Sequence, residues 1–347
     1  MIQIGSLFQQ KHPEVPIVLN KGRYLVVDLD PTLAHELLAE EEGCYTIRPL
    51  QWGEVVFATP SLRAARSARS TRIAWVQELV GRLSRSNLEA NLARLVSFPT
   101  RHSTSTHYSK AASWAKAQLV AMAYNTRTQS VSVGAGKSRN VIAEKRGNGV
   151  GTRNLILVVA HLDSININGG ASAPAPGADD NGSGSVGLLE IARAMKDHTN
   201  VHDLRFVLFG GEEQGLFGSK KYVASLTASE RARIRAVVNM DMIATVNTSS
   251  PSILLEGASL SQAVIDGLAE AAATYTQLTV QTSLNPFNSD HVPFIESGVP
   301  AVLIIEGTDS ANHNVHTSGD VLSHINYDLM LGILRTATAF VATSVGR

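Results

Sequence analysis

The spacing of apolar residues along the chain changes near residue 70. Beyond that point, short runs that are apolar throughout alternate with longer segments in which apolar residues recur at helical spacing. A strand buried on both faces of a sheet has the first pattern, and a helix with one buried face has the second. The alternation predicts an α/β fold with a mostly parallel, mixed central sheet and helices on both of its faces.

Individual elements follow from the same pattern. Apolar-rich runs predict strands at residues 155–160, 204–209, 236–240 and 301–305, and the first of these is apolar throughout. Helical spacing predicts helices at residues 71–84, 86–96, 108–123, 185–195, 218–226, 260–274 and 327–343. The second helix has a start pattern, Ser86-Asn87-Leu88-Glu89, in which Ser86 takes the capping position.

The first 68 residues have a different pattern, typical of a small α+β unit. Strands are predicted at 23–29, 45–48 and 54–58, and a short helix at 33–41. Residues 63–70, which follow, are small, polar and basic, with arginine at 63, 66 and 69. Two interpretations of this stretch stay open: a solvated linker or helix end, and a cleavable junction behind a pro-region.

Composition excludes several classes of protein. The chain has 347 residues with 30 basic and 30 acidic side chains, so it lacks the charge excess that binding to nucleic acid requires. No uninterrupted apolar run of about 18 residues predicts a membrane span, and the first residues lack a signal-peptide pattern. The single cysteine, Cys44, excludes an internal disulfide and a thiolate metal site. We expect Cys44 to be structural.

Ionisable residues follow each of the four predicted strands. In an open α/β sheet, ligands bind beyond the carboxyl ends of the strands, so these residues share one edge. They are His161 and Asp163 after the first strand, Glu212 and Glu213 after the second, Asp241 after the third, and Glu306, His313 and His316 after the last. The loop after the first strand adds Asp179 and Asp180.

Each of these residues alone has an ordinary structural interpretation, such as a hydrogen-bonded histidine, a solvated pair of glutamates or an Asp-Asn-Gly turn. Together in one cleft, carboxylates repel one another and lose their water, so we expect a cation among them. Imidazole and carboxylate ligands without thiolate favour Zn²⁺, with Mn²⁺ or Co²⁺ as substitutes.

Six motifs in order resemble those of the bacterial leucyl aminopeptidase family of di-zinc exopeptidases, over residues 75–345. They are His161-x-Asp163, Asp180-x-x-Ser183-Gly184, Glu212-Glu213, Asn239-x-Asp241, Ser289-Asp290-His291 and His316-Thr317-x-x-Asp320. The resemblance implies the zinc-exopeptidase, phosphorylase/hydrolase-like fold. It divides the chain into a pro-region-like segment at 1–68 and a catalytic domain at 69–347.

The resemblance also implies two zinc ions per chain. His161 and Asp241 would bind one ion, and Glu213 and His316 the other. Asp180 would bridge the two, and the choice of Asp180 over its neighbour rests on its spacing to Ser183-Gly184. Relatives have a cis peptide bond after the bridging aspartate, so we expect one here.

Further roles come from the same resemblance. Glu212 would be the general base, and Asp163 would orient the first histidine through its other ring nitrogen. Relatives have an apolar pocket for the first side chain, and Met242, Ile305 and Val315 are the candidates to line it, with ordinary core packing as an equal alternative. His291 and His313 are expected to have no part in metal binding.

The resemblance implies an aminopeptidase that acts on peptides with a free N-terminus and prefers apolar first residues such as leucine. We expect a monomer, secreted or periplasmic, with no nucleic-acid or membrane partner. The chain departs from some relatives in having no cysteine at residues 283–288, where they carry a disulfide. Residues 1–68 lie outside the catalytic resemblance, and an inhibitory pro-region is one hypothesis for them.

Three alternatives remain. Glutaminyl cyclases share the acidic pair on this fold but use one zinc ion. Carboxypeptidases and dipeptidases hold a substrate carboxylate, which needs a cationic group near the metals, and no arginine adjoins a motif at 206–230 or 236–334. A non-catalytic binding domain would have lost a ligand or the base, and this chain has all six residues.

Overall fold

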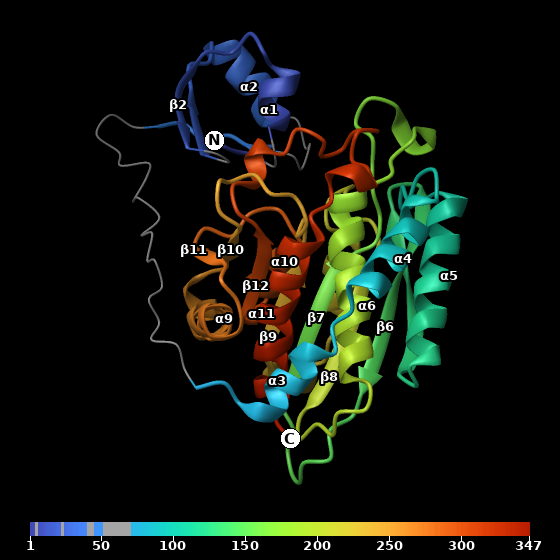
Figure 1. The fold of residues 1–347 in the computed structure, drawn as a ribbon. Helices are drawn as coiled ribbons and strands as arrows, with labels where there is room; N and C mark the ends of the chain where they lie inside the picture. Colours follow the sequence, from blue (N-terminus) through green and yellow to red (C-terminus); the bar gives the residue numbers. More distant parts are fainter. Residues whose placement is uncertain (4–5, 22–23, 40–44, 51–70) are drawn as a thin grey trace.

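The computed structural model describes residues 1–3, 6–21, 24–39, 45–50 and 71–347. Figure 1 shows a large α/β domain with a smaller unit, drawn in blue, at one end. Three features predicted from the sequence lie outside the described residues: the strand at 54–58, the basic junction at 63–70 and the environment of Cys44.

An eight-stranded sheet forms the centre of the large domain, in the order β11-β10-β12-β9-β7-β8-β6-β5. The strands are β5 (Asn125–Val133), β6 (Gly136–Lys145), β7 (Leu155–His161), β8 (Asp203–Phe209), β9 (Ile234–Met240), β10 (Ser252–Glu256), β11 (Thr279–Ser283) and β12 (Ala301–Glu306). The four middle strands, β8, β7, β9 and β12, are parallel, whereas β10 is antiparallel to β12 and β6 to β8. The predicted fold class, a mixed and mostly parallel sheet, is confirmed.

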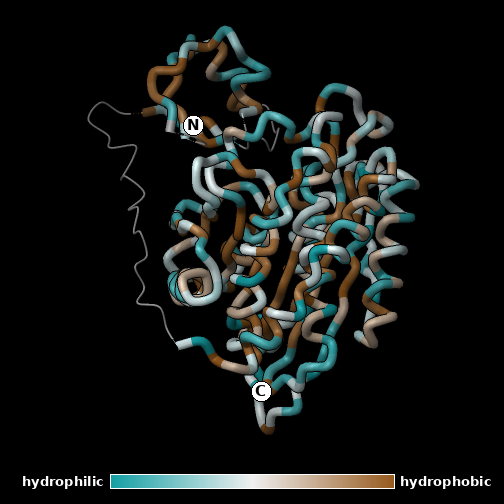
Figure 2. Tube along the Cα trace, in the orientation of Figure 1, coloured by the Kyte–Doolittle hydropathy of each residue, from teal (hydrophilic) through white to brown (hydrophobic). Residues whose placement is uncertain are grey.

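Helices cover both faces of this sheet. They are α3 (Ala74–Gly81), α4 (Arg85–Val96), α5 (Thr106–Ala121), α6 (Gly184–Met195), α7 (Phe217–Ser225), α8 (Ala228–Arg233), α9 (Gln262–Tyr275), α10 (His291–Glu296) and α11 (Tyr327–Val345). Residues of α3, α4, α5, α6, α9 and α11 join the larger apolar core, and residues of α7 and α10 join the smaller core. Figure 2 shows the apolar colour concentrated along the inner strands.

Strand β7 shows why continuous apolar runs occur in this sequence. Every residue of the strand is buried. Ile156 and Val158 point into the larger core, while Leu157 and Val159 point into the smaller one. A central parallel strand has no solvated face, so both sets of alternating side chains must be apolar.

Helix α11 meets the length and composition criterion for a membrane span, and it alone does so within the described part of the chain. It contains no uninterrupted apolar run of about 18 residues, and 72% of its apolar stretch is buried inside the fold. Packing against the sheet and α9 therefore accounts for its composition.

Several elements were not predicted. In the large domain, the sequence patterns did not predict strands β5, β6, β10 and β11 or helices α8 and α10. The strands β10 and β11 and both helices have only five or six residues, and β5 and β11 are the edge strands of the sheet. The capping residue of α4 was predicted two residues too late, at Ser86. Its capping residue is Ser84, whose hydroxyl accepts from the backbone N–H of Asn87 at 3.3 Å.

The smaller unit is an α+β fold, as predicted. Its sheet has the order β2-β3-β1-β4 and consists of β1 (Ile2–Gln3), β2 (Ile17–Lys21), β3 (Tyr24–Val27) and β4 (Tyr45–Thr46), with α1 (Leu7–Lys11) and α2 (Pro31–Ala39). Phe8, Leu25, Leu37 and Tyr45 form its core. In Figure 1 this N-terminal unit lies over the loops at one end of the large sheet.

The chain order within the parallel strands opens a crevice at that end. From β7 the chain passes through α6 to β8 on one side, and then crosses back to β9 on the other side of β7. The loops after β7 and β9 therefore turn away from each other. Such a switch point is where open α/β sheets bind ligands.

Candidate metal centre

Five potential metal ligands come together at the carboxyl edge of the sheet. His161 is the last residue of β7, and Asp241 directly follows β9, the adjacent strand across the switch point. Asp180 lies on the connection from β7 to α6. Glu213 follows β8, and His316 lies between β12 and α11.

Asp180 faces both histidines. Its Oδ1 lies 3.3 Å from Nε2 of His161, and its Oδ2 lies 3.0 Å from Nε2 of His316. Nε2 of His161 is also 3.2 Å from Oδ1 of Asp241, and Nε2 of His316 is 2.7 Å from Oε2 of Glu213. Two groups of three potential ligands, each with ligand atoms within 4.8 Å of one another, therefore share Asp180.

Burial makes this concentration of charge costly. None of the five side chains is more than 11% exposed. Burial, reinforced by the charge of Asp180, raises the pKa of Glu213 to about 7. Burial alone would lower the pKa of His161, but the carboxylates of Asp241, Glu212 and Asp180 outweigh it and raise that pKa well above its ordinary value.

The donor set fits divalent cations at both groups. One carboxylate oxygen, Oε1 of Glu213, is buried and has no hydrogen-bond partner among the described residues. Such an oxygen is destabilising unless a cation or hydrogen-bond donor meets it. Each group offers one imidazole nitrogen and two carboxylates, without sulfur, which suits Zn²⁺ and its substitutes Mn²⁺ and Co²⁺.

Glu212 borders the two groups without belonging to either. It is 8% exposed, lines the same pocket, and its Oε2 lies 3.9 Å from Nε2 of His161. Burial raises the pKa of Glu212 well above its ordinary value; His161 lowers it, while the carboxylates of Asp290, Glu213 and Asp241 raise it further. A carboxylate with a raised pKa, open to the pocket, is suited to carry a proton.

Asp163 is fully buried, but its contacts differ from the expected one. Its Oδ1 lies 3.8 Å from Nδ1 of His161, which is longer than a hydrogen bond. Its two oxygens instead accept from the backbone N–H groups of Glu212 at 3.4 Å and Glu213 at 3.3 Å. Asp163 therefore holds the backbone of the acidic pair.

Asp320, the last residue of the sixth motif, holds the backbone at Asp180. Both oxygens of Asp320 accept from the peptide N–H groups of Asp179 and Asp180, at 2.9 Å each. The carboxylate of Asp179 points away, toward Thr245 and Ala244. The peptide bond between Asp180 and Asn181 is cis, as expected.

Two further motif residues support Asp241. The hydroxyl of Ser289 donates to Oδ2 of Asp241 at 2.7 Å and accepts from Asn239 at 2.8 Å.

His291 is buried and belongs to neither ligand group, and its Nε2 lies 3.7 Å from Oε1 of Glu256. His313 is exposed and lies outside both groups.

The predicted pocket residues form an apolar cluster beside the ligands. Met242, Ile305 and Val315 pack together with Leu303. Met242 and Ile305 line the pocket that also contains the ligands, whereas Val315 lies behind it. Sequence reasoning missed three lining residues, which are Leu303, Phe287 and Asn288. Met242 and His316 have φ values of 50° and 58°, a left-handed conformation that few non-glycine residues adopt.

Arg101 was also missed, because its partners are backbone carbonyls that no sequence motif reveals. It is fully buried between α4 and α5. Its guanidinium donates to the carbonyls of Leu162, Pro176 and Gly177 at 2.9, 2.5 and 2.8 Å. Arg101 therefore fixes both ends of the loop that leads to Asp180.

Arg101→Met is expected to lower the free energy of unfolding by about 3 kcal/mol or more, since three carbonyl groups lose their donor. Arg101→Lys keeps the charge but cannot reach three carbonyls with one ammonium group, so it should fall between methionine and wild type. Urea unfolding of zinc-free protein measures both. A loss below about 1 kcal/mol in Arg101→Met would show that the loop holds without the guanidinium.

Comparison with known proteins agrees with this site. The sequence model of peptidase family M28 matches residues 140–341, more than half of the chain. The probable leucine aminopeptidase of Arthroderma otae is 29% identical over 299 residues, which cover 82% of this chain and 79% of that protein.

Two solved structures share the fold. A zinc aminopeptidase from Bacillus subtilis has a TM-score of 0.69 at 18% identity, covering 76% of this chain and 96% of that one. The glutaminyl cyclase of Porphyromonas gingivalis has a TM-score of 0.61 at 22% identity, covering 75% and 98%. At these identities the structures establish the fold and not the reaction. The sequence match, by contrast, runs from β6 to α11 and includes all five potential ligands, so this chain belongs to peptidase family M28.

Proposed function

We propose that this chain is an aminopeptidase that holds two zinc ions and hydrolyses the first peptide bond of peptides with a free N-terminus. The observation that carries the proposal is the position of Asp180, which offers one oxygen to each of two groups of potential ligands. A carboxylate in that position suits a pair of ions rather than one. The leucine aminopeptidase relative and the zinc aminopeptidase with this fold support the choice of reaction and metal.

In this proposal, His161 and Asp241 would hold one zinc ion, Glu213 and His316 would hold the other, and Asp180, which belongs to both groups, would help to hold each. When bound, the ions supply the Lewis acidity that activates water and polarises a carbonyl group. The protein holds the ligands in place through Asp320, Ser289 and Asp163, whose contacts are described above.

Glu212 moves the protons of the reaction. Its carboxylate takes a proton from the attacking water, and the same group then delivers that proton to the nitrogen of the leaving amine. The C–O bond forms first, and the peptide C–N bond breaks when its nitrogen receives the proton, so the products are a free amino acid and a shortened peptide. Cations at the two ligand groups would favour the ionised form of Glu212, which the base step requires.

The pocket accounts for the selection of the first residue. The acidic groups attract the free α-amine of a peptide, whereas an internal residue has no such amine. The apolar residues Met242, Leu303 and Ile305 line the adjacent wall. This composition suits an aliphatic first side chain such as leucine.

The test is the hydrolysis of leucyl-p-nitroanilide by purified protein, with and without a chelator, together with a count of bound zinc. Hydrolysis that the chelator abolishes and added zinc restores, with about two zinc ions per chain, supports the proposal. No hydrolysis with about one zinc per chain would instead favour the cyclase reaction, since a cyclase shares this fold.

We also propose that residues 1–68 limit access to the site. The hydroxyl of Ser6 lies 2.7 Å from Nδ1 of His313, three residues before His316. The hydroxyl of Tyr24 lies 3.3 Å from that of Ser283, where β11 ends and the pocket-lining residues begin. The N-terminal unit, which Figure 1 shows over the loops at this end of the sheet, thus contacts both the loop that bears His316 and the end of β11.

Cleavage by trypsin near Arg63, Arg66 and Arg69 is therefore expected to raise kcat/KM for leucyl peptides, and more for long peptides than for leucyl-p-nitroanilide. The measurement compares intact and cleaved protein after gel filtration, with mass spectrometry to locate the cut. A sample exposed to inactivated trypsin is the control. Equal activity of the intact and cleaved chains on long peptides would contradict the proposal.

A further inference from the structure

A fully buried carboxylate, Glu256, lies beside the apolar pocket and has no place in the mechanism above. Glu256 is the last residue of β10 and is 0% exposed. Its cross-strand partner on β12 is Leu303, a pocket-lining residue, and directly paired residues of antiparallel strands point to the same face. Leu254, two residues earlier on that face, packs against the apolar cluster of the pocket.

The contacts of Glu256 lead to the opposite wall of the pocket. We call residues 284–290 the pocket segment; it connects β11 to α10 and includes the lining residues Phe287, Asn288 and Ser289. Oε1 of Glu256 accepts a hydrogen bond from the backbone N–H of Phe287 at 3.0 Å. The same oxygen lies 3.7 Å from Nε2 of His291, the first residue of α10.

The pocket segment is held at both ends, and the hydrogen bond from Phe287 to Glu256 joins its middle to the sheet. At its start, the N–H of Asn285 donates to the hydroxyl of Ser283 at 3.1 Å. At its end, Ser289 donates to Asp241 at 2.7 Å. The segment contains no cysteine, so no disulfide can hold it.

We propose that Glu256 is a positioning residue that holds Phe287 and thereby sets the size of the pocket for the first side chain. This inference rests on the proposed function for its substrate. The carboxylate takes no part in the chemistry, because its contacts lead to the pocket segment rather than to the metal ligands. Holding the pocket wall at one distance from Leu303 and Ile305 accounts for a buried carboxylate at this position.

Two conservative variants separate the reach of the side chain from its charge. Glu256→Asp keeps the charge but is one methylene shorter, so it cannot reach the N–H of Phe287 without a shift of the backbone. Glu256→Gln keeps the length and an acceptor oxygen but loses the charge. The proposal expects Glu256→Asp to change the preference for the first side chain and Glu256→Gln to keep the wild-type preference.

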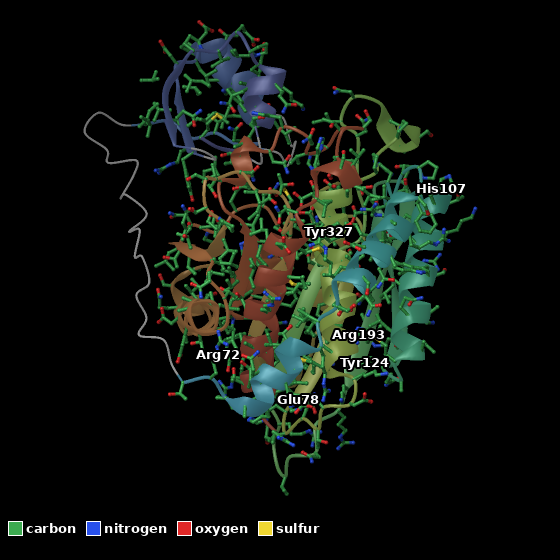
Figure 3. All side chains as sticks on the ribbon, in the orientation of Figure 1. Arg72, Glu78, His107, Tyr124, Arg193 and Tyr327 are labelled. Carbon is green, nitrogen blue, oxygen red and sulfur yellow. The ribbon has the colours of Figure 1, made fainter. Side chains whose placement is uncertain are left out.

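Glu190 offers a matched control. It is 1% exposed, and it accepts from the backbone N–H of Ser84 at 2.5 Å and from Arg193. Glu190 lies in the carboxyl-terminal half of α6, away from the helix start that follows Asp180. Figure 3 shows its partner Arg193 well below the N-terminal unit. Glu190→Asp therefore shortens an equally buried carboxylate by the same methylene without touching the pocket.

The first measurement compares leucyl- and alanyl-p-nitroanilide. In Glu256→Asp, KM for the leucyl substrate should rise by about 5- to 10-fold with little change in kcat, and the leucyl preference over alanyl should fall by a similar factor. Glu256→Gln and Glu190→Asp should keep the wild-type preference to within about twofold. Loss of folded protein would lower kcat for both substrates together and leave their ratio unchanged.

The second measurement needs no substrate. Hydrogen exchange at residues 284–290 should be faster in Glu256→Asp than in wild type, and unchanged in Glu256→Gln and Glu190→Asp. An unchanged preference in Glu256→Asp overturns the proposal, even with faster exchange, because the segment would then not set the pocket. If the wild-type protein hydrolyses neither substrate, the proposed function fails. Separately, hydrogen exchange in Glu256→Asp at the wild-type rate would show that Glu256 does not hold the pocket segment.

Discussion

Glu212→Gln is expected to lower kcat for leucyl-p-nitroanilide by about 10²- to 10⁴-fold while both zinc ions stay bound. Glutamine has the shape of glutamate but cannot take a proton from water or deliver one to the leaving amine. Glu212 lies in neither group of potential ligands, so its replacement should leave metal binding intact. Steady-state kinetics and elemental zinc analysis on the same preparation measure the two quantities.

Glu213→Gln is the matched control for that experiment, because it replaces a carboxylate with an amide at the neighbouring residue. Glu213 belongs to a ligand group, and its Oε2 lies 2.7 Å from Nε2 of His316. We expect this variant to lose zinc as well as activity. Retention of more than about one-tenth of wild-type kcat in Glu212→Gln would show that another group carries the proton.

Asp180→Ala is expected to weaken both zinc sites, because Asp180 belongs to both ligand groups, and zinc content should fall from about two per chain to below about one. Its two oxygens are the contacts that join the His161 group to the His316 group. Hydrolysis should fall below detection even at zinc concentrations that saturate wild type. Isothermal titration calorimetry with zinc, beside the activity assay, measures both effects.

Asp241→Ala separates the bridging role from that of an ordinary ligand. Asp241 belongs to one group, so its loss should weaken one zinc site and leave the other near its wild-type affinity. If Asp180→Ala instead bound zinc like Asp241→Ala, with one site lost and one unchanged, the two groups would be independent and the bridging role would be wrong.

The fold alone does not decide which reaction takes place. A zinc aminopeptidase and a glutaminyl cyclase both share it, with TM-scores of 0.69 and 0.61. The distinction lies in the ligand groups at the carboxyl edge of the sheet, where Asp180 joins one group to the other. Zinc stoichiometry is therefore the measurement that separates the two reactions.

The sequence predicted the parallel centre of the sheet because burial on both faces leaves a continuous apolar run, as in β7. It did not predict β5, an edge strand in which five of nine residues are exposed and only Val131 and Val133 are buried. A polar edge strand has the composition of a loop, so only its pairing with β6 identifies it.

The candidate ligands could be found from the sequence because each follows or adjoins an apolar strand at the edge where parallel strands end. What the sequence could not provide was the set of contacts that hold them. Arg101 binds loop carbonyls, Asp320 binds two peptide N–H groups, and Glu256 binds the N–H of Phe287. Backbone groups are the same at every residue, so no motif marks such partners. The sequence by itself determined the chemical character of the site, whereas the tertiary structure decided which side chains hold it in place, because that depends on distances between segments far apart in the chain.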